Sequence, residues 1–140
     1  MEAIARWQEG LQFEGAFSTG SAIAMDASKK EGGADKGPRP VELFVMALAG
    51  CSGMDVLAIL KKKRVEVSAF QVSVHGEQQA RAPKVFKKLH VVYDVTGQGV
   101  KLDAVQQAVH LTEKKYCSVS AMIRQAVEIT SEIRIHEERS

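Results

Sequence analysis

Residues 40–64 read PVELFVMALAGCSGMDVLAILKKKR, and this stretch decides the fold. Pro40 stands at a favourable first helical position, Glu42 lies in the first turn, and four basic residues close the segment. Its apolar residues occupy every face between Leu43 and Leu60, as in a helix that protein surrounds on all sides. We therefore expect a long, buried central helix over residues 40–64.

Small residues recur along this helix, at Ala47, Ala49, Gly50, Ser52 and Gly53. Each glycine inside a helix costs about 1 kcal/mol relative to alanine, so some other interaction must offset that cost. A missing side chain lets a second backbone approach closely. We expect another element to pack tightly along this part of the helix.

The residues before the helix predict strands and a loop. Apolar and polar residues alternate with the period of a strand over the first 26 residues, and turn signals at Gly10 and Gly20 divide them. This pattern predicts a three-stranded antiparallel meander. Residues 28–39, SKKEGGADKGPR, combine glycine with mixed charge and predict a surface loop.

The residues after the helix complete a mixed fold. Strand periodicity returns over residues 67–78 and 85–96, on either side of the turn QQARAPK. Helical spacing follows over 102–115 and 118–127, and a final strand is expected over 129–136. The fold class is therefore α+β, and we expect one domain over residues 1–140.

Composition excludes several classes of protein. The 140 residues are 45% apolar and 26% charged with a formal net charge of +2, which argues against a disordered chain. The basic residues form no dense block, so we expect neither a nucleic-acid nor a membrane partner. The start, MEAIARWQEG, resembles no secretory signal, and no run of 18 uncharged apolar residues follows. These features predict a soluble, cytoplasmic protein.

Two cysteines are the main candidates for chemistry. Cys51 and Cys117 stand 66 positions apart, with no CxxC motif and no histidine at ligand spacing, so the pattern does not predict a zinc site. They are either buried apolar thiols or a reactive pair. Small neighbours leave room for a ligand beside Cys51. The predicted helix N-terminus at Cys117, with Lys114 and Lys115 nearby, favours a thiolate there.

Three charged residues on either side of Cys51 in the sequence each have more than one interpretation. Arg39, held between two prolines, either stabilises a thiolate or is a surface residue that pairs with Glu42. Glu42 either orients Arg39 or caps the helix. Asp55 lies one turn beyond Cys51 and needs a partner if buried, and we expect it to accept a hydrogen bond from the sheet. The four histidines are expected to be structural or solvated: His75, His90, His110 and His136.

Two segments together resemble a known family. The run GPRPVELFVMALAGCSGMDVLAILKKKR and the later LTEKKYCSVSAMI are similar to segments of the OsmC/Ohr family, the osmotically inducible and organic hydroperoxide resistance proteins, and in particular to its YhfA-like branch. The resemblance implies an intertwined homodimer whose two central helices pack together. It also implies a thiol-dependent peroxidase that reduces organic hydroperoxides, with Cys51 as the peroxidatic and Cys117 as the resolving cysteine.

The resemblance implies the rest of the mechanism as well. Cys51 becomes a sulfenic acid, Cys117 closes a disulfide, and an external dithiol reduces it without a metal or organic cofactor. Arg39 lowers the pKa of Cys51, and Glu42 joins it in the catalytic set. The apolar tail of the substrate is expected to meet Phe44, Leu48 and Met54.

One departure from the family pattern supports an alternative. In the hydroperoxidase branches a glutamate directly follows the proline before the helix, whereas here that position is Val41 and the acid is Glu42. One residue is about 100° of helix rotation, so the position of Glu42 does not require it to face the same arginine. The alternative is a non-catalytic dimer of the same fold that binds a small ligand or senses redox state.

Overall fold

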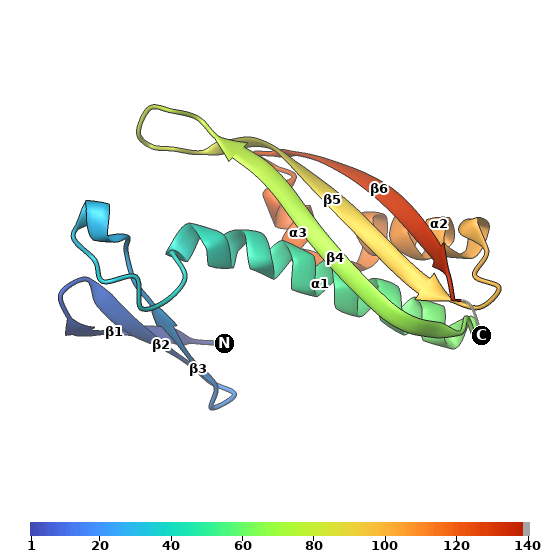
Figure 1. The fold of residues 1–140 in the computed structure, drawn as a ribbon, viewed down its shortest axis with the longest axis horizontal. Helices are drawn as coiled ribbons and strands as arrows, with labels where there is room; N and C mark the ends of the chain where they lie inside the picture. The colour runs from blue at the N-terminus through green and yellow to red at the C-terminus, as the bar shows by residue number, and fades with distance from the viewer. Residues whose placement is uncertain (139–140) are drawn as a thin grey trace. The chain divides into compact units, whose positions relative to one another are not determined.

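The computed structural model describes residues 1–138 and confirms an α+β fold with two sheets (Figure 1). Contacts divide the chain into two compact units, Met1–Val45 and Met46–Ser140, each with a three-stranded sheet. The single domain expected over residues 1–140 stays a prediction. The two units are described in turn.

The N-terminal unit contains the predicted meander. Strands β1 (Ala3–Glu9), β2 (Gln12–Phe17) and β3 (Ala22–Met25) pair antiparallel in chain order. Gly10 takes a positive φ of 53° in the first turn, a conformation that glycine adopts without strain. Several large apolar side chains of this unit are exposed, among them Trp7 at 65%.

A buried aspartate organises the loop that follows the meander. Asp26 is only 2% exposed, and its carboxylate accepts hydrogen bonds from the backbone N–H groups of Ala27, Ala34 and Lys36. The short 3₁₀ helix η1 (Lys29–Glu31) lies within the segment that these bonds close. The loop expected over 28–39 is therefore folded back onto one anion.

The C-terminal unit has a mixed sheet. Strands β4 (Val67–Gln78) and β5 (Phe86–Gly97) pair antiparallel, and β6 (Glu128–Glu137) lies parallel to β5, so β5 is the middle strand. A parallel pair needs a crossover, and residues 98–127 provide it. The side chains of β5 that point inward fill the core: Leu89, Val91, Tyr93 and Val95.

Helix α1 spans Pro40–Lys62, close to the predicted 40–64. It ends early because Arg64 takes a left-handed φ of 59°, while the N–H of Val65 bonds the carbonyl of Leu60. From residue 46 onward a stripe of buried residues faces the core of the C-terminal unit: Leu48, Ser52, Val56 and Leu60. Gly53 faces β4, where an added Cβ would lie 3.2 Å from a methyl carbon of Val72, as the predicted close packing requires.

The crossover holds the two remaining helices, both shorter than predicted. Helix α2 covers Leu102–Leu111 and continues as one π-helical turn, η2 (Thr112–Tyr116). Helix α3 covers only Ser118–Ile123, and hydrogen-bonded turns carry the chain on to Val127. The extended backbone at Cys117 (ψ 102°) ends η2 and separates it from α3.

By length and composition alone, α1 is apolar enough to cross a membrane. One side of it is nevertheless buried against the rest of the C-terminal unit, as in the core helix of a folded domain. The apolar residues on its other side are solvent-exposed in the single chain, with Met46 at 65% and Met54 at 75%. The helix expected to be surrounded by protein is thus buried along one side by described residues of the C-terminal unit, while Met46 and Met54 are exposed.

Candidate functional site

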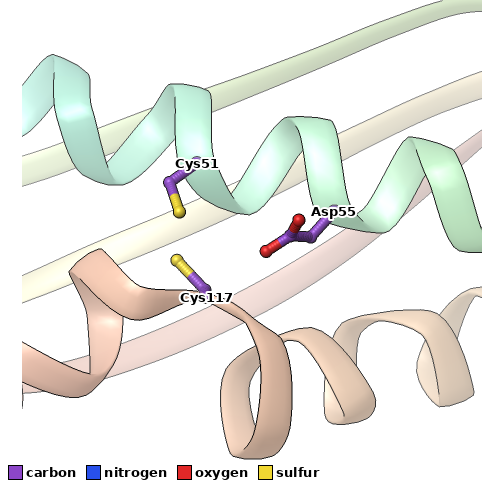
Figure 2. A group of neighbouring side chains, drawn as sticks. All are labelled: Cys51, Asp55 and Cys117. Carbon is purple, nitrogen blue, oxygen red and sulfur yellow. The ribbon is translucent and has the colours of Figure 1, made fainter.

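The fold brings the two cysteines together. Cys51 projects from α1, and Cys117 occupies the position before α3 (Figure 2). Their sulfur atoms lie within 4.8 Å of each other, and both thiols are free. Residues 66 positions apart in the sequence thus form one site, because the crossover places Cys117 against the middle of α1.

Cys117 is the better stabilised thiolate. Its Sγ accepts a hydrogen bond from the N–H of Ser120 at 3.3 Å and lies 3.6 Å from the Oγ of Ser52. Burial alone would raise the pKa of Cys117, but hydrogen bonds from Cys51, the Ser120 amide and Ser52 outweigh it and lower that pKa. The thiolate predicted at this helix N-terminus is therefore favoured by the local geometry.

Cys51 has the opposite balance. It is half-buried, whereas Cys117 is 2% exposed, so Cys51 is the thiol that solvent reaches. Burial raises the pKa of Cys51, and the nearby Cys117 and Asp55 raise it further against a hydrogen bond from the Val119 backbone. Of the two thiols, Cys117 therefore ionises more readily, and a proton shared by the pair is favoured on Cys51.

Asp55 corrects a prediction. Its carboxylate was expected to accept a hydrogen bond from the sheet, but it lies within 4.8 Å of both sulfurs (Figure 2). Cys51 and Asp55 are four residues apart on α1, so they share one side of the helix. This spacing was the available signal that Asp55 belongs to the cysteine site.

A buried polar chain behind Cys117 was not predicted. Tyr93 is fully buried and donates a hydrogen bond of 3.4 Å to Glu113. Burial raises the pKa of Tyr93, with a further contribution from Glu113, against a hydrogen bond from Ser52. Glu113 also lies 3.8 Å from Arg124. Ser52 thus links the sulfur of Cys117 to a hydroxyl and a carboxylate from two other elements.

Arg39 and Glu42 lie in the N-terminal unit and do not pair through their side chains. The Arg39 guanidinium binds the carboxylate of Asp35 and the carbonyl of Gly37. Glu42 accepts a hydrogen bond of 2.9 Å from the backbone N–H of Arg39, which is the capping alternative. Asp35, at a positive φ of 55°, is therefore the acid that holds the arginine. The role predicted for Arg39 toward Cys51 stays a prediction.

The residues predicted to form a substrate pocket differ in exposure. Leu48 is fully buried in the core, Phe44 is 43% exposed in the N-terminal unit, and Met54 is 75% exposed. Their role in substrate binding stays a prediction.

Two histidines of the sheet have structural partners, in agreement with the expected structural role. His90 binds Thr130 and Glu132, whereas His136 binds Asp94. The hydrogen bond from His90, together with one from Arg134, lowers the pKa of Glu132. These ring nitrogens are therefore engaged with neighbouring strands of the sheet.

Comparison with known proteins gives the class of the molecule. Residues 33–132, which include both cysteines, match the family described as OsmC-like protein. The chain belongs to that family. It is also 41% identical over 130 residues to the protein YhfA of Escherichia coli strain K12. That match covers 93% of this chain and 94% of YhfA.

Solved structures agree with the family assignment. A hypothetical protein from Aquifex aeolicus VF5 superposes with a TM-score of 0.85 at 30% identity, covering 99% of this chain and 97% of that one. The organic hydroperoxide resistance protein OhrB of Bacillus subtilis superposes with a TM-score of 0.62 at 18% identity, covering 95% and 96%. At that identity, the second comparison supports the fold.

Proposed function

We propose that this protein is a thiol-dependent peroxidase that reduces organic hydroperoxides to alcohols. The observation that carries the proposal is the pair of free sulfurs within 4.8 Å, one half-exposed and one buried. Membership of a family that includes organic hydroperoxide resistance proteins supports the substrate class. The chemistry needs no metal or organic cofactor.

In the first step Cys51 attacks the hydroperoxide. Its sulfur bonds to the distal oxygen of ROOH, the O–O bond breaks, and the proton of Cys51 reaches the departing alkoxide to give ROH. Cys51 is left as a sulfenic acid. The Cys117 thiolate, which accepts a hydrogen bond from Cys51, is placed to take that proton during the attack and to pass it on.

In the second step Cys117 resolves the sulfenic acid. The Cys117 thiolate bonds to the Cys51 sulfur, the S–O bond of the sulfenic acid breaks, and the departing hydroxide takes a proton from solvent to become water. An external dithiol then reduces the disulfide and is itself oxidised to a disulfide. A buried thiolate suits this role, because it meets the neighbouring sulfenic acid before it meets solvent oxidants.

Arg39 belongs to the same proposal. A guanidinium close to Cys51 would stabilise its thiolate and the departing oxygen, and Asp35 supplies the carboxylate that fixes its orientation. The Glu42 carboxylate supports Arg39 by accepting a hydrogen bond from the Arg39 backbone N–H. Phe44, Leu48 and Met54 are proposed to favour hydroperoxides with an apolar tail.

The active form is proposed to be a homodimer. Along α1, Met46 and Met54 are exposed, and an added Cβ at Gly50 between them would meet no atom within 4 Å. This stripe lies at i, i+4 and i+8, so a second copy of the helix can approach it closely. Sedimentation at micromolar concentration should give a dimer, and a folded monomer would contradict this expectation.

Stopped-flow oxidation of the reduced protein tests the function. Cumene hydroperoxide should consume both thiols much faster than hydrogen peroxide does, and a thiol count should fall from two to none. The single disulfide should be recovered as free thiols by a dithiol. Oxidation of Cys51 no faster than that of free cysteine would contradict the peroxidase proposal.

Slow oxidation of Cys51 would instead favour a redox sensor or a small-ligand-binding dimer of the same fold. The observation behind this alternative is the raised pKa of Cys51, which reduces its thiolate fraction at neutral pH. A sensor would still form the disulfide, but slowly and without turnover in the presence of a dithiol. Steady-state peroxide consumption therefore separates the two functions.

A further inference from the structure

Three potential ligand atoms converge beside the middle of α1. The sulfurs of Cys51 and Cys117 and a carboxylate oxygen of Asp55 all lie within 4.8 Å of one another. Two come from one side of α1, and the third faces them from the segment before α3 (Figure 2). The sequence alone shows no metal-ligand motif, because only the fold brings Cys117 to Cys51 and Asp55.

Asp55 has no role in the proposed peroxidase steps. Within residues 1–138 its carboxylate makes no hydrogen bond and no ion pair. Its charge also disfavours the neighbouring Cys51 thiolate. Like charges at this separation repel, whereas a cation between them would be attracted to each of the three groups. The cluster therefore lacks a positive partner.

The spacing fits one small ion. Zinc binds thiolate sulfur at about 2.3 Å and carboxylate oxygen at about 2.0–2.2 Å in tetrahedral geometry. Two sulfurs on one such ion lie about 3.8 Å apart, which the observed spacing reaches with small side-chain movements. The hydrogen bond from the Ser120 amide to the Cys117 sulfur supplies the outer support that metal ligands ordinarily have.

The donor set selects the kind of metal. Calcium and magnesium take oxygen ligands, six or more in number, and two sulfurs do not suit them. Thiolates with one carboxylate suit zinc, a borderline-soft ion. Three protein ligands also leave the fourth tetrahedral position to water.

We propose that the reduced protein binds one zinc ion per chain through Cys51, Cys117 and Asp55. Zinc binding and the disulfide exclude each other, because both use the same two sulfurs. Zinc also occupies the electron pair with which Cys51 attacks peroxide, so the metal-bound protein is protected from oxidation. The binding site is independent of the proposed peroxidase, and only this protection rests on that function.

Titration of the reduced, metal-free protein with Co²⁺ tests the site by a spectroscopic readout. A thiolate-to-cobalt charge-transfer band in the near ultraviolet and tetrahedral d–d bands should saturate at one ion per chain, and Zn²⁺ should abolish them. The same chain oxidised to the disulfide should give neither band. Equal binding by the oxidised and reduced chains would overturn the proposal.

Asp55→Asn keeps the shape of the side chain and removes the ligand charge. Zinc affinity, measured by competition with a chelating dye, should fall by at least about tenfold, the lower end of what losing even an outer-shell partner costs. Asp103→Asn is the matched control, because Asp103 is exposed in the first turn of α2, and it should bind zinc as the wild type does. Unchanged affinity in Asp55→Asn would remove Asp55 from the site.

Oxidation by cumene hydroperoxide, with and without one equivalent of Zn²⁺, separates this proposal from the peroxidase. Zinc should slow thiol loss, and a chelator should restore it. Equal rates would overturn the protection. Thiols that resist peroxide in the metal-free protein while the cobalt bands still form would contradict the peroxidase and support the metal site.

Discussion

The loop before α1 and the cysteine site treat their charged groups in opposite ways. In the loop, three backbone amides bind Asp26, and Asp35 binds Arg39; in the first turn of α1, Glu42 accepts a hydrogen bond from the Arg39 backbone. In the cysteine site Asp55 approaches two sulfurs within 4.8 Å and has no hydrogen-bond partner among residues 1–138. Charge in the loop maintains structure, whereas charge in the site opposes the ionisation of its neighbour.

The contrast shows where function costs stability. Charged groups with hydrogen-bond partners stabilise the folded chain, so their removal should lower the free energy of unfolding. Removal of a charge that has no hydrogen-bond partner and lies beside a reactive thiol should instead change the reactivity of that thiol and the binding of ligands. The two regions therefore predict different phenotypes for the same kind of substitution.

Substitution of the cysteines should have the largest effect. Cys51→Ser should abolish peroxide consumption, because the thiol that solvent reaches is gone. Cys117→Ser should still permit one turnover and leave a sulfenic acid on Cys51, trapped by a dimedone-type reagent and located by mass spectrometry. A sulfenic acid trapped on Cys117 in the Cys51→Ser variant would reverse the two roles.

Asp26→Asn should lower the stability of the loop. Burial raises the pKa of Asp26, but hydrogen bonds from the Lys36, Ala27 and Ala34 amides outweigh it and leave that pKa below the ordinary 3.8. A lowered folded-state pKa contributes stability above pH 3.8 that is lost as pH falls through the folded value.

The wild type should therefore show a loss of stability in urea melts below about pH 4 that Asp26→Asn lacks, and the variant should be less stable at pH 7. Glu14→Gln, at an exposed position of β2, is the matched control and should behave as the wild type. Parallel pH profiles for the wild type and Asp26→Asn would show that the carboxylate does not organise the loop.

Asp55→Asn should act in the other direction, on reactivity. Loss of its charge should lower the pKa of Cys51, and each unit gives about tenfold more thiolate at pH values below that pKa. Iodoacetamide should alkylate Cys51 faster at pH 7 in the presence of a chelator, with the unfolding midpoint unchanged. A slower reaction would mean that Asp55 assists the ionisation of Cys51.

Glu42→Gln should have the smallest effect. The amide oxygen can still accept the Arg39 backbone hydrogen bond, and the loss of charge near the helix N-terminus costs a few tenths of a kcal/mol. Chemical denaturation should detect that change, while the rate of peroxide oxidation stays the same. A marked fall in the oxidation rate would place Glu42 in the catalytic machinery.

Much of the fold was predictable from local patterns. The helix over 40–64 and the strands over 67–78 and 85–96 follow from periodicity and end signals, which act over a few residues. The length of α3 was overestimated, because the apolar residues keep helical spacing after Ile123 although the chain there forms turns. The pairing of Cys51 with Cys117 came from family resemblance, since no local rule connects them.

The charged partners were not predictable in the same way. Arg39 binds Asp35 because a residue with a positive φ turns the loop back, and the amides that hold Asp26 come from as far as Lys36. Neither arrangement leaves a periodic trace in the sequence. Asp55 was only partly predictable. Its spacing places it on the same side of α1 as Cys51, but the sequence does not say which element that side faces.

The parallel pairing of β5 with β6 sets the order in which the site can form. The β4–β5 hairpin joins segments close in sequence, whereas β6 pairs with β5 across residues 98–127, and pairing at larger sequence separation is slower to form. Cys117 lies in that crossover, so we expect it to reach Cys51 after the hairpin has formed. During synthesis Cys51 therefore emerges 66 residues before Cys117, and oxidants present at that stage would meet a single thiol.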